Sequence, residues 1–244
     1  MKKRVLTWLA PGLLVLGGCS TLCAAPDMEM VISNGAGDSL TVNETGGVVT
    51  ESSIGAVTFI TGVYTPGFGL TIQALVGQFQ VETTGEGHGD VTQPTLADLN
   101  QIQASTSRAA GTLNVVFTDT GYTDFGIGFL LGVSGTNDKG IIASTADFST
   151  SVDAANAIPA GTLVGSIDGE TGNPTTSYST VETFTNPIGT SGSLTEHTTL
   201  HFTGQGAMQA NFTISAVPEP ASVLLFGGVL LLSTRVLRKK LRKV

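Results

Sequence analysis

Residues 26–217 consist of short stretches in which apolar and polar side chains alternate, separated by turns rich in Gly, Asn, Asp and Thr. Alternation with a period of two places apolar side chains on one face of a β-strand. Met28–Ile32 and Ser39–Val42 flank a polar turn and predict a hairpin, and Leu70–Val76 alternates in the same way. Because short strands joined by polar turns are typical of sandwiches, we expect an all-β fold, a two-layer antiparallel β-sandwich of about nine or ten strands.

One segment departs from this alternation. Thr95 and Asp98 have the spacing of a helix N-cap and its partner, and Leu96, Leu99 and Ile102 would follow one helical face. The pattern predicts one short helix between the strands.

Two further positions interrupt the strands. Gly77 changes the phase of the alternation, which is consistent with a β-bulge. Near the C-terminus, Leu200 and Phe202 precede the turn residues Gly204–Gly206, and alternating apolar residues resume at Met208. These last two stretches predict a closing hairpin.

The N-terminus has the pattern of a secretory signal peptide, with basic Met1–Arg4 followed by apolar Val5–Gly18. Two cleavage sites remain open. A small-residue site ends at Ala25 and gives a signal peptide over 1–25, whereas the residues before Cys19 resemble a lipobox that would make Cys19 a lipid-carrying N-terminus. We favour Ala25, because a lipid would duplicate the C-terminal anchor described below. The exported domain, 26–216, would then contain no cysteine and hence no disulfide.

The exported part of the chain is strongly acidic. Residues 26–217 contain 18 acidic side chains and only two basic ones, Arg108 and Lys139, although the whole chain has a net charge of −8. A domain of this charge does not attract nucleic acid or anionic lipid, and it repels acidic polysaccharides unless cations intervene. We therefore expect no nucleic-acid partner.

The C-terminus combines an extended motif, an apolar run and a basic tail. The apolar run from Ala221 to Thr234 is uncharged and would be about 21 Å long as a helix, which is short for a bilayer core of about 30 Å. A transmembrane segment over 221–237 is therefore a marginal permanent anchor. The basic tail over 235–244 orients this end toward the cytoplasm through Arg235, Arg238, Lys239, Lys240, Arg242 and Lys243.

Residues 217–244 resemble the PEP-CTERM sorting signal. The motif consists of Val217, Pro218, Glu219, Pro220, Ala221 and Ser222. The resemblance implies processing by an exosortase, a membrane-embedded enzyme, after the chain is held in the inner membrane. A second resemblance rests on the exported domain: an early hairpin at Ile32–Gly35, a strand from Gly111 that runs to Asp119–Thr123, and a last hairpin that leads into Val217–Pro220. This pattern is similar to uncharacterised PEP-CTERM proteins, and the resemblance implies no reaction.

The three histidines do not form a metal motif. His197 and His201 would share one face of a strand but lie about 13 Å apart at about 3.3 Å per residue. A single ion with bonds near 2 Å cannot contact both. We expect both to face solvent, on the side of the strand opposite Leu200 and Phe202.

Several polar residues in predicted turns are candidate Ca²⁺ ligands. They are Glu86, His88, Asp90, Asp119, Asp124, Asn137 and Asp138. Because Asp, Asn and Gly form turns without any ligand, we assign no metal site and no cofactor.

No nucleophile motif, phosphate loop or dinucleotide fingerprint is present in the sequence. A pair of carboxylates could still be close in space, but there is no Trp after Trp8 to stack on a sugar. The sequence thus predicts a protein that is not an enzyme.

We expect a non-enzymatic cell-surface or extracellular-matrix protein of the exopolysaccharide or biofilm layer. It would be exported by the general secretory pathway, anchored by its C-terminal helix, and then sorted to the surface or released. Exopolysaccharide is a candidate partner beside the exosortase. The alternatives are a carbohydrate-binding or Ca²⁺-dependent adhesive module and, less favoured, a secreted hydrolase on a β scaffold.

Overall fold

The computed structural model describes residues 28–66, 68–87, 95–106, 110–123, 125–138, 144–159, 161–171, 177–187 and 191–217. Within these ranges the chain forms strands and turns, and no helix there has the length and apolar character needed to cross a bilayer. Most of the predicted terminal features lie outside the described residues. These are the signal peptide with Cys19 and Ala25, the sorting motif after Val217, the segment 221–237 and the basic tail.

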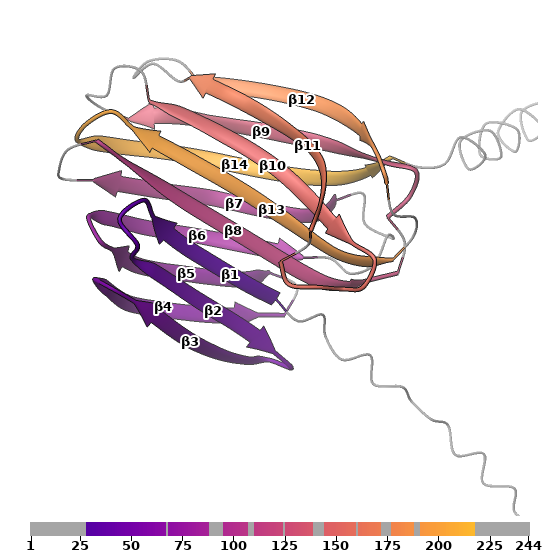
Figure 1. Ribbon diagram of the computed structural model, residues 1–244, viewed down its shortest axis with the longest axis horizontal. Helices are drawn as coiled ribbons and strands as arrows, with labels where there is room; N and C mark the ends of the chain where they lie inside the picture. Colours follow the sequence, from indigo (N-terminus) through magenta and orange to yellow (C-terminus); the bar gives the residue numbers. More distant parts are fainter. Residues whose placement is uncertain are drawn as a thin grey trace, which may run out of the picture.

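The described residues form two seven-stranded sheets, stacked as layers (Figure 1). The first sheet has the spatial order β11 (Thr162–Thr171), β10 (Thr145–Asp153), β13 (Gly192–Phe202), β8 (Gly111–Tyr122), β1 (Met28–Asn34), β2 (Ser39–Thr45), β3 (Val48–Ile54). The second has the order β12 (Ser177–Thr185), β9 (Gly128–Asp138), β14 (Gly206–Val217), β7 (Thr95–Thr106), β6 (Phe79–Gly87), β5 (Gly69–Val76), β4 (Val57–Thr65).

All strand pairs in the two sheets are antiparallel. The predicted antiparallel sandwich is confirmed, and the described residues alone form fourteen strands rather than nine or ten. Strands β3 and β10 were not expected, because their sequences are rich in Ser and Thr, although β10 buries Ala146, Phe148 and Val152.

The predicted N-terminal hairpin is also confirmed. In the β1–β2 pair, Met30 lies opposite Val42 and Ile32 opposite Leu40. All four side chains are fully buried between the sheets, where removal of apolar surface from water stabilises the fold. The same alternation along the other strands supplies the rest of the core.

The predicted helix is wrong, because Thr95–Thr106 forms strand β7 between β6 and β14. Leu99 and Ile102 are both buried although they are three residues apart. A bulge explains this spacing: the register with both neighbouring strands shifts here, and Gln101 has a φ of 53°. The Gln101 N–H donates to Asn211 Oδ1 at 2.8 Å. The bulge changes which alternate residues point into the core. The resulting three-residue spacing of buried side chains resembled that of a helix.

The expected bulge at Gly77 is wrong as well. Val76 of β5 pairs with Phe79 of β6, so Gly77 and Gln78 form a two-residue turn. Gly77 has a φ of 58°, a conformation that glycine adopts without steric cost.

The prediction that the last two strands pair with each other as a closing hairpin is wrong. Strands β13 and β14 follow each other in the chain and bury the expected side chains, including Phe202 and Met208. However, β13 pairs with β10 and β8, whereas β14 pairs with β7 and β9. The turn around Gly204 therefore crosses from one sheet to the other.

We expect Gly69→Ala to destabilise the fold more than Gly37→Ala. Both glycines have positive φ values, 82° and 95°, so each substitution carries about 1–2 kcal/mol of backbone strain. At Gly69 an added Cβ would also lie 2.1 Å from the carbonyl oxygen of Gly85 on β6, whereas nothing lies within 4 Å at Gly37. The difference in free energy of unfolding, measured with urea, should be about 1–3 kcal/mol. Equal losses for the two variants would contradict this packing.

Candidate functional site

The outer face of the first sheet carries a regular array of polar side chains on β8, β13 and β10. Cross-strand pairing places them in three rows: Thr112, His201 and Thr145; Asn114, Thr199 and Asp147; Val116, His197 and Ser149. Eight of these nine side chains are polar, and all are partly exposed. We call this set of nine residues the polar face. Successive side chains of a strand point to opposite faces of the sheet. The alternate residues of these strands, such as Leu200 and Phe202, therefore lie in the core and leave the polar ones outside.

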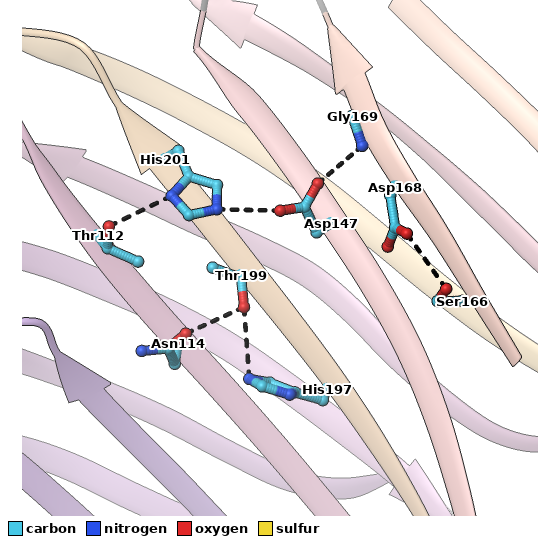
Figure 2. Close-up of polar contacts among 9 residues, drawn as sticks. All are labelled: Thr112, Asn114, Asp147, Ser166, Asp168, Gly169, His197, Thr199 and His201. Atoms are coloured by element: carbon cyan, nitrogen blue, oxygen red, sulfur yellow. Dashed lines mark hydrogen bonds and ion pairs between the residues drawn. The ribbon is translucent and has the colours of Figure 1, made fainter. Parts of the chain in front are cut away.

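Side-chain hydrogen bonds connect the strands across the polar face (Figure 2). His201 Nε2 lies 2.9 Å from Asp147 Oδ2, and His201 Nδ1 lies 3.3 Å from Thr112 Oγ1. The backbone N–H of Gly169, on β11, donates to Asp147 Oδ1 at 2.7 Å. These contacts hold the imidazole of His201 and the carboxylate of Asp147 in fixed positions over β8, β13, β10 and β11.

A second group of contacts lies beside the first (Figure 2). Thr199 Oγ1 donates to Asn114 Oδ1 at 3.0 Å and lies 3.4 Å from His197 Nε2. Burial lowers the pKa of His197, so its imidazole is neutral at neutral pH. A neutral imidazole offers one donor and one acceptor, as hydroxyl and amide groups also do. The polar face therefore presents both hydrogen-bond donors and acceptors at fixed spacings.

The predicted orientation of the histidines is confirmed, since His197 and His201 both lie on the outer side of β13. They contact different partners, with Thr199 between them in the strand. Among the described residues, no three His, Cys, Asp or Glu side chains are placed to hold one metal ion.

Thr112, His201 and Asp147 are the residue types of a hydrolytic triad, but their setting differs from one. Thr112 lies within the β8–β13 ladder opposite His201, and its carbonyl accepts a hydrogen bond from the Gly35 N–H at 3.2 Å. Acyl transfer also needs free donors aimed at a developing oxyanion. A strand paired with neighbours on both sides has its backbone donors committed to the sheet, so this geometry suits hydrogen-bonded binding better than acyl transfer.

The structure also places three carboxyl groups inside the sandwich, which the sequence did not predict. Glu44, Asp119 and Glu196 are fully buried. Met28 pairs with Glu44 on one side and with Asp119 on the other, and Glu196 pairs with Phe117 in the adjacent row. Glu44 Oε2, Asp119 Oδ2 and both Glu196 oxygens have no hydrogen-bond partner within the protein. We call these three residues the interior carboxyl group.

Asp119 is thus corrected from an exposed turn residue to a buried one in β8. Its partner in the sequence-based Ca²⁺ hypothesis, Asp124, lies outside the described residues, as do His88 and Asp90. Glu86 is part of β6, and Asn137 and Asp138 end β9. Asp, Thr and Gly are common in turns, so the sequence around Asp119 indicated a turn where the chain forms a strand.

Burial controls the protonation of two members of this group, Asp119 and Glu196. Burial raises the pKa of Asp119 to about 7, against opposing hydrogen bonds from Tyr122 and the Thr120 N–H, and the charge of Glu44 raises it further. Burial also raises the pKa of Glu196 well above its usual range, with added repulsion from Asp98 and Asp119. Among the described residues, no basic side chain is paired with this group.

A surface hollow of about 670 Å³ lies at the turn end of β1, β5 and the start of β8. Asp38 lines this hollow and connects two turns. Its Oδ1 accepts a hydrogen bond from the Ala56 N–H at 2.6 Å, and its Oδ2 accepts one from Asn34 Nδ2 at 2.8 Å. These bonds lower the pKa of Asp38. Among the described residues, Asp38 is the one carboxylate that lines this hollow, and Glu82 is the one that lines a smaller hollow of about 200 Å³. Neither hollow thus provides the pair of carboxylates that a glycosidase requires.

No known family model matches this sequence, and no curated protein matches it. Among solved structures, the carbohydrate-binding module TmCBM61 bound to β-1,4-galactotriose has 11% identity and a TM-score of 0.33, covering 59% of this chain and 90% of its own. The enzymatically active domain of bacteriophage CBA120 tailspike protein 4 has 14% identity and a TM-score of 0.33, covering 58% and 20%.

A third match belongs to carbohydrate-binding modules of the β-sandwich superfamily with promiscuous specificity. It has 10% identity and a TM-score of 0.28, covering 78% of this chain and 84% of the other. Superpositions of this extent carry no argument about function.

We expect Asp119→Asn to remove a pH-dependent loss of stability. The pKa of Asp119 is raised from 3.8 to about 7, so between these values the unfolded chain releases a proton that the folded chain keeps. The free energy of unfolding of the wild type should therefore fall as pH rises through this window, by an amount on the order of 2–4 kcal/mol. Asn carries no such proton, so the variant should be more stable than the wild type at pH 8.

Urea unfolding from pH 4 to 8 measures this difference. The matched control is Asp168→Asn on exposed β11, which should change stability by less than about 0.5 kcal/mol at each pH. The pKa of Glu196 is raised in both proteins, so the contribution of Asp119 is the difference between their profiles. Wild-type and variant stabilities that fall by the same amount between pH 4 and 7 would show that Asp119 is ionised in the folded chain.

Proposed function

We propose that this chain is a non-enzymatic cell-surface protein that binds neutral polysaccharide of the extracellular matrix through its polar face. The observation that carries the proposal is the array of hydroxyl, amide, imidazole and carboxylate groups over β8, β13 and β10. Sugars present hydroxyl groups that both donate and accept hydrogen bonds, and this array offers partners of both kinds at fixed positions.

The spacing of the polar face suits an extended chain of sugars. Neighbouring strands are about 4.8 Å apart and alternate residues of one strand about 6.6 Å apart. A linear polysaccharide lying across β8, β13 and β10 would thus meet a polar group at each strand. Thr199, at the centre of the array, already connects Asn114 with His197.

The negative charge of the domain favours a neutral polysaccharide over an acidic one. Residues 26–217 contain 18 acidic and two basic side chains, so an acidic polysaccharide would be repelled at ordinary salt concentration. The polar face contains no Trp or Tyr on which a sugar ring could stack. Each contact is therefore a hydrogen bond that replaces hydrogen bonds to water, with a net gain of about 0.5–1.5 kcal/mol. A single site of this kind binds weakly. Many copies on one surface, acting on a long polymer, would supply avidity.

The terminal segments support the location of this function. The proposal includes export through the N-terminal signal peptide and exosortase sorting through the motif that begins at Val217. Val217 is the last residue of β14, so the motif would follow the sandwich directly. A binding domain released or attached at this point would face the extracellular matrix.

We expect Thr199→Val to weaken binding of a neutral polysaccharide about tenfold, which corresponds to roughly 1.4 kcal/mol. Valine keeps the shape of threonine but removes the hydroxyl that contacts Asn114 and His197. Affinity electrophoresis of the full chain through gels with dextran, a soluble β-glucan or alginate measures this effect.

The matched control is Thr213→Val on the outer side of β14, where Thr213 Oγ1 donates to Asp98 at 3.1 Å. This control should bind as the wild type does. Equal losses in the two variants, or wild-type retardation by alginate alone, would contradict a neutral-polysaccharide site on the polar face.

For sorting, we expect Pro218→Ala combined with Glu219→Ala to block C-terminal processing in a host that has an exosortase. Alanine lets the segment leave the extended conformation that proline imposes, and it removes the carboxylate. Intact-mass measurement should show that the wild type has lost the residues after the motif and that the variant retains them. Equal masses and equal cell fractions for both chains would refute exosortase sorting, while leaving the test of the polar face untouched.

A further inference from the structure

The two edges of the sandwich differ in the charged side chains that they carry. At the edge formed by β11 and β12, the ring of Phe184 lies over Gly165, where an added Cβ would be 2.3 Å from it. Thr180 Oγ1 of β12 also donates to Glu170 Oε1 of β11. These contacts join the last strands of the two sheets, and the carboxylates on these strands include Asp168, Glu170 and Glu182.

The opposite edge is formed by β3 and β4 (Figure 1). Strand β4 ends the second sheet, and within the described chain its backbone pairs with β5 on one side only. Its sequence, VTFITGVYT, contains no charged residue and no proline. Ile60 and Val63 project outward with 53% and 51% of their surface exposed. An edge strand that is long, apolar and free of protective charges is a template for pairing with another strand.

Charge indicates where two copies can approach each other. The exported domain is acidic almost throughout, so most of its surfaces repel a second copy. Strands β3 and β4 together carry one carboxylate, Glu51. This edge is therefore a surface on which two identical chains can meet with little repulsion.

We propose that β4 is a self-association site, at which a second copy of this chain adds its own β4 in antiparallel orientation. A twofold axis makes such an edge self-complementary, so the second sheets of both copies join into one continuous sheet. The backbone groups on the outer side of β4 would pair with each other, and Ile60 and Val63 would be covered. For a surface protein that binds a long polymer weakly, two joined copies would double the number of polymer contacts.

The backbone of β4 favours a closed dimer over a fibre. Its register with β5 shifts between Phe59 and Thr61, so the strand is not uniformly flat. Irregular edges limit indefinite stacking of strands. The β11–β12 edge carries the carboxylates Asp168, Glu170 and Glu182, which disfavour a head-to-tail contact between acidic copies.

The test is the double variant Ile60→Lys with Val63→Lys in the full chain, purified in mild detergent and studied by sedimentation velocity over a range of concentrations. We expect the wild type to show a reversible monomer–dimer equilibrium. Two lysines on each edge would face those of the partner, so the dimer dissociation constant should rise at least tenfold. Hydrogen exchange of the amides of Val57–Thr65 should slow as the wild type dimerises.

The matched control is Leu163→Lys with Val181→Lys on β11 and β12, where the side chains are exposed to a similar extent, 61% and 60%. This control should dimerise as the wild type does. A wild type that is monomeric throughout, a dimer that survives the β4 lysines, or an equal loss in the control would overturn the proposal. If circular dichroism shows that the lysine variant is unfolded, Ile60→Thr with Val63→Thr is used instead, and an unchanged dimer affinity in it would overturn the proposal as well.

Discussion

The two sheets pack closely because large inward side chains of one sheet lie against glycines of the other. Phe117 of β8 faces Gly85 of β6, where an added Cβ would lie 2.4 Å from the ring. Phe184 of β12 faces Gly165 of β11 in the same way. A protein interior tolerates little excess volume, so these positions require glycine. The other features of the structure, the polar face included, depend on the sheets being held at this separation.

The same packing explains where the interior carboxyl group lies. Gly87 on β6 leaves space for Asp119, since a Cβ there would lie 2.0 Å from Asp119 Oδ2. Asp119 and Glu196 sit among apolar residues without a basic partner in the described chain. They are neutral when protonated, and their ionisation opposes folding. A protein built in this way is expected to be more stable in mildly acidic surroundings than in alkaline ones. It gains no catalytic pair from these residues, because they are enclosed between the sheets.

The core and the polar face lie on opposite sides of the same strands. On β13, Leu200 and Phe202 belong to the core, whereas His197, Thr199 and His201 belong to the polar face. The core fixes the positions of the polar groups, which need only small hydrogen-bond networks to orient them. The edge strand β4 adds a different kind of surface, with exposed apolar side chains and, within the described residues, backbone paired on one side only, which suits association with another copy. A hydroxyl-rich ligand and a second chain would therefore bind to separate parts of the molecule.

The sequence alone determined the fold class and much of the inward and outward orientation of side chains, because the period of two in Met28–Ile32, Leu70–Val76 and Met208–Ile214 directly reflects strand geometry. It also placed His197 and His201 on the outer side of a strand. Alternation does not say which strands are neighbours, so only the tertiary structure separated β13 from β14 and brought Thr112 and Asp147 to His201. Local spacing likewise misassigned Leu99 and Ile102 to a helix and Asp119 to a turn. In both cases pairing with strands distant in the sequence outweighed the local preference, and such pairing leaves no mark in the spacing of nearby residues.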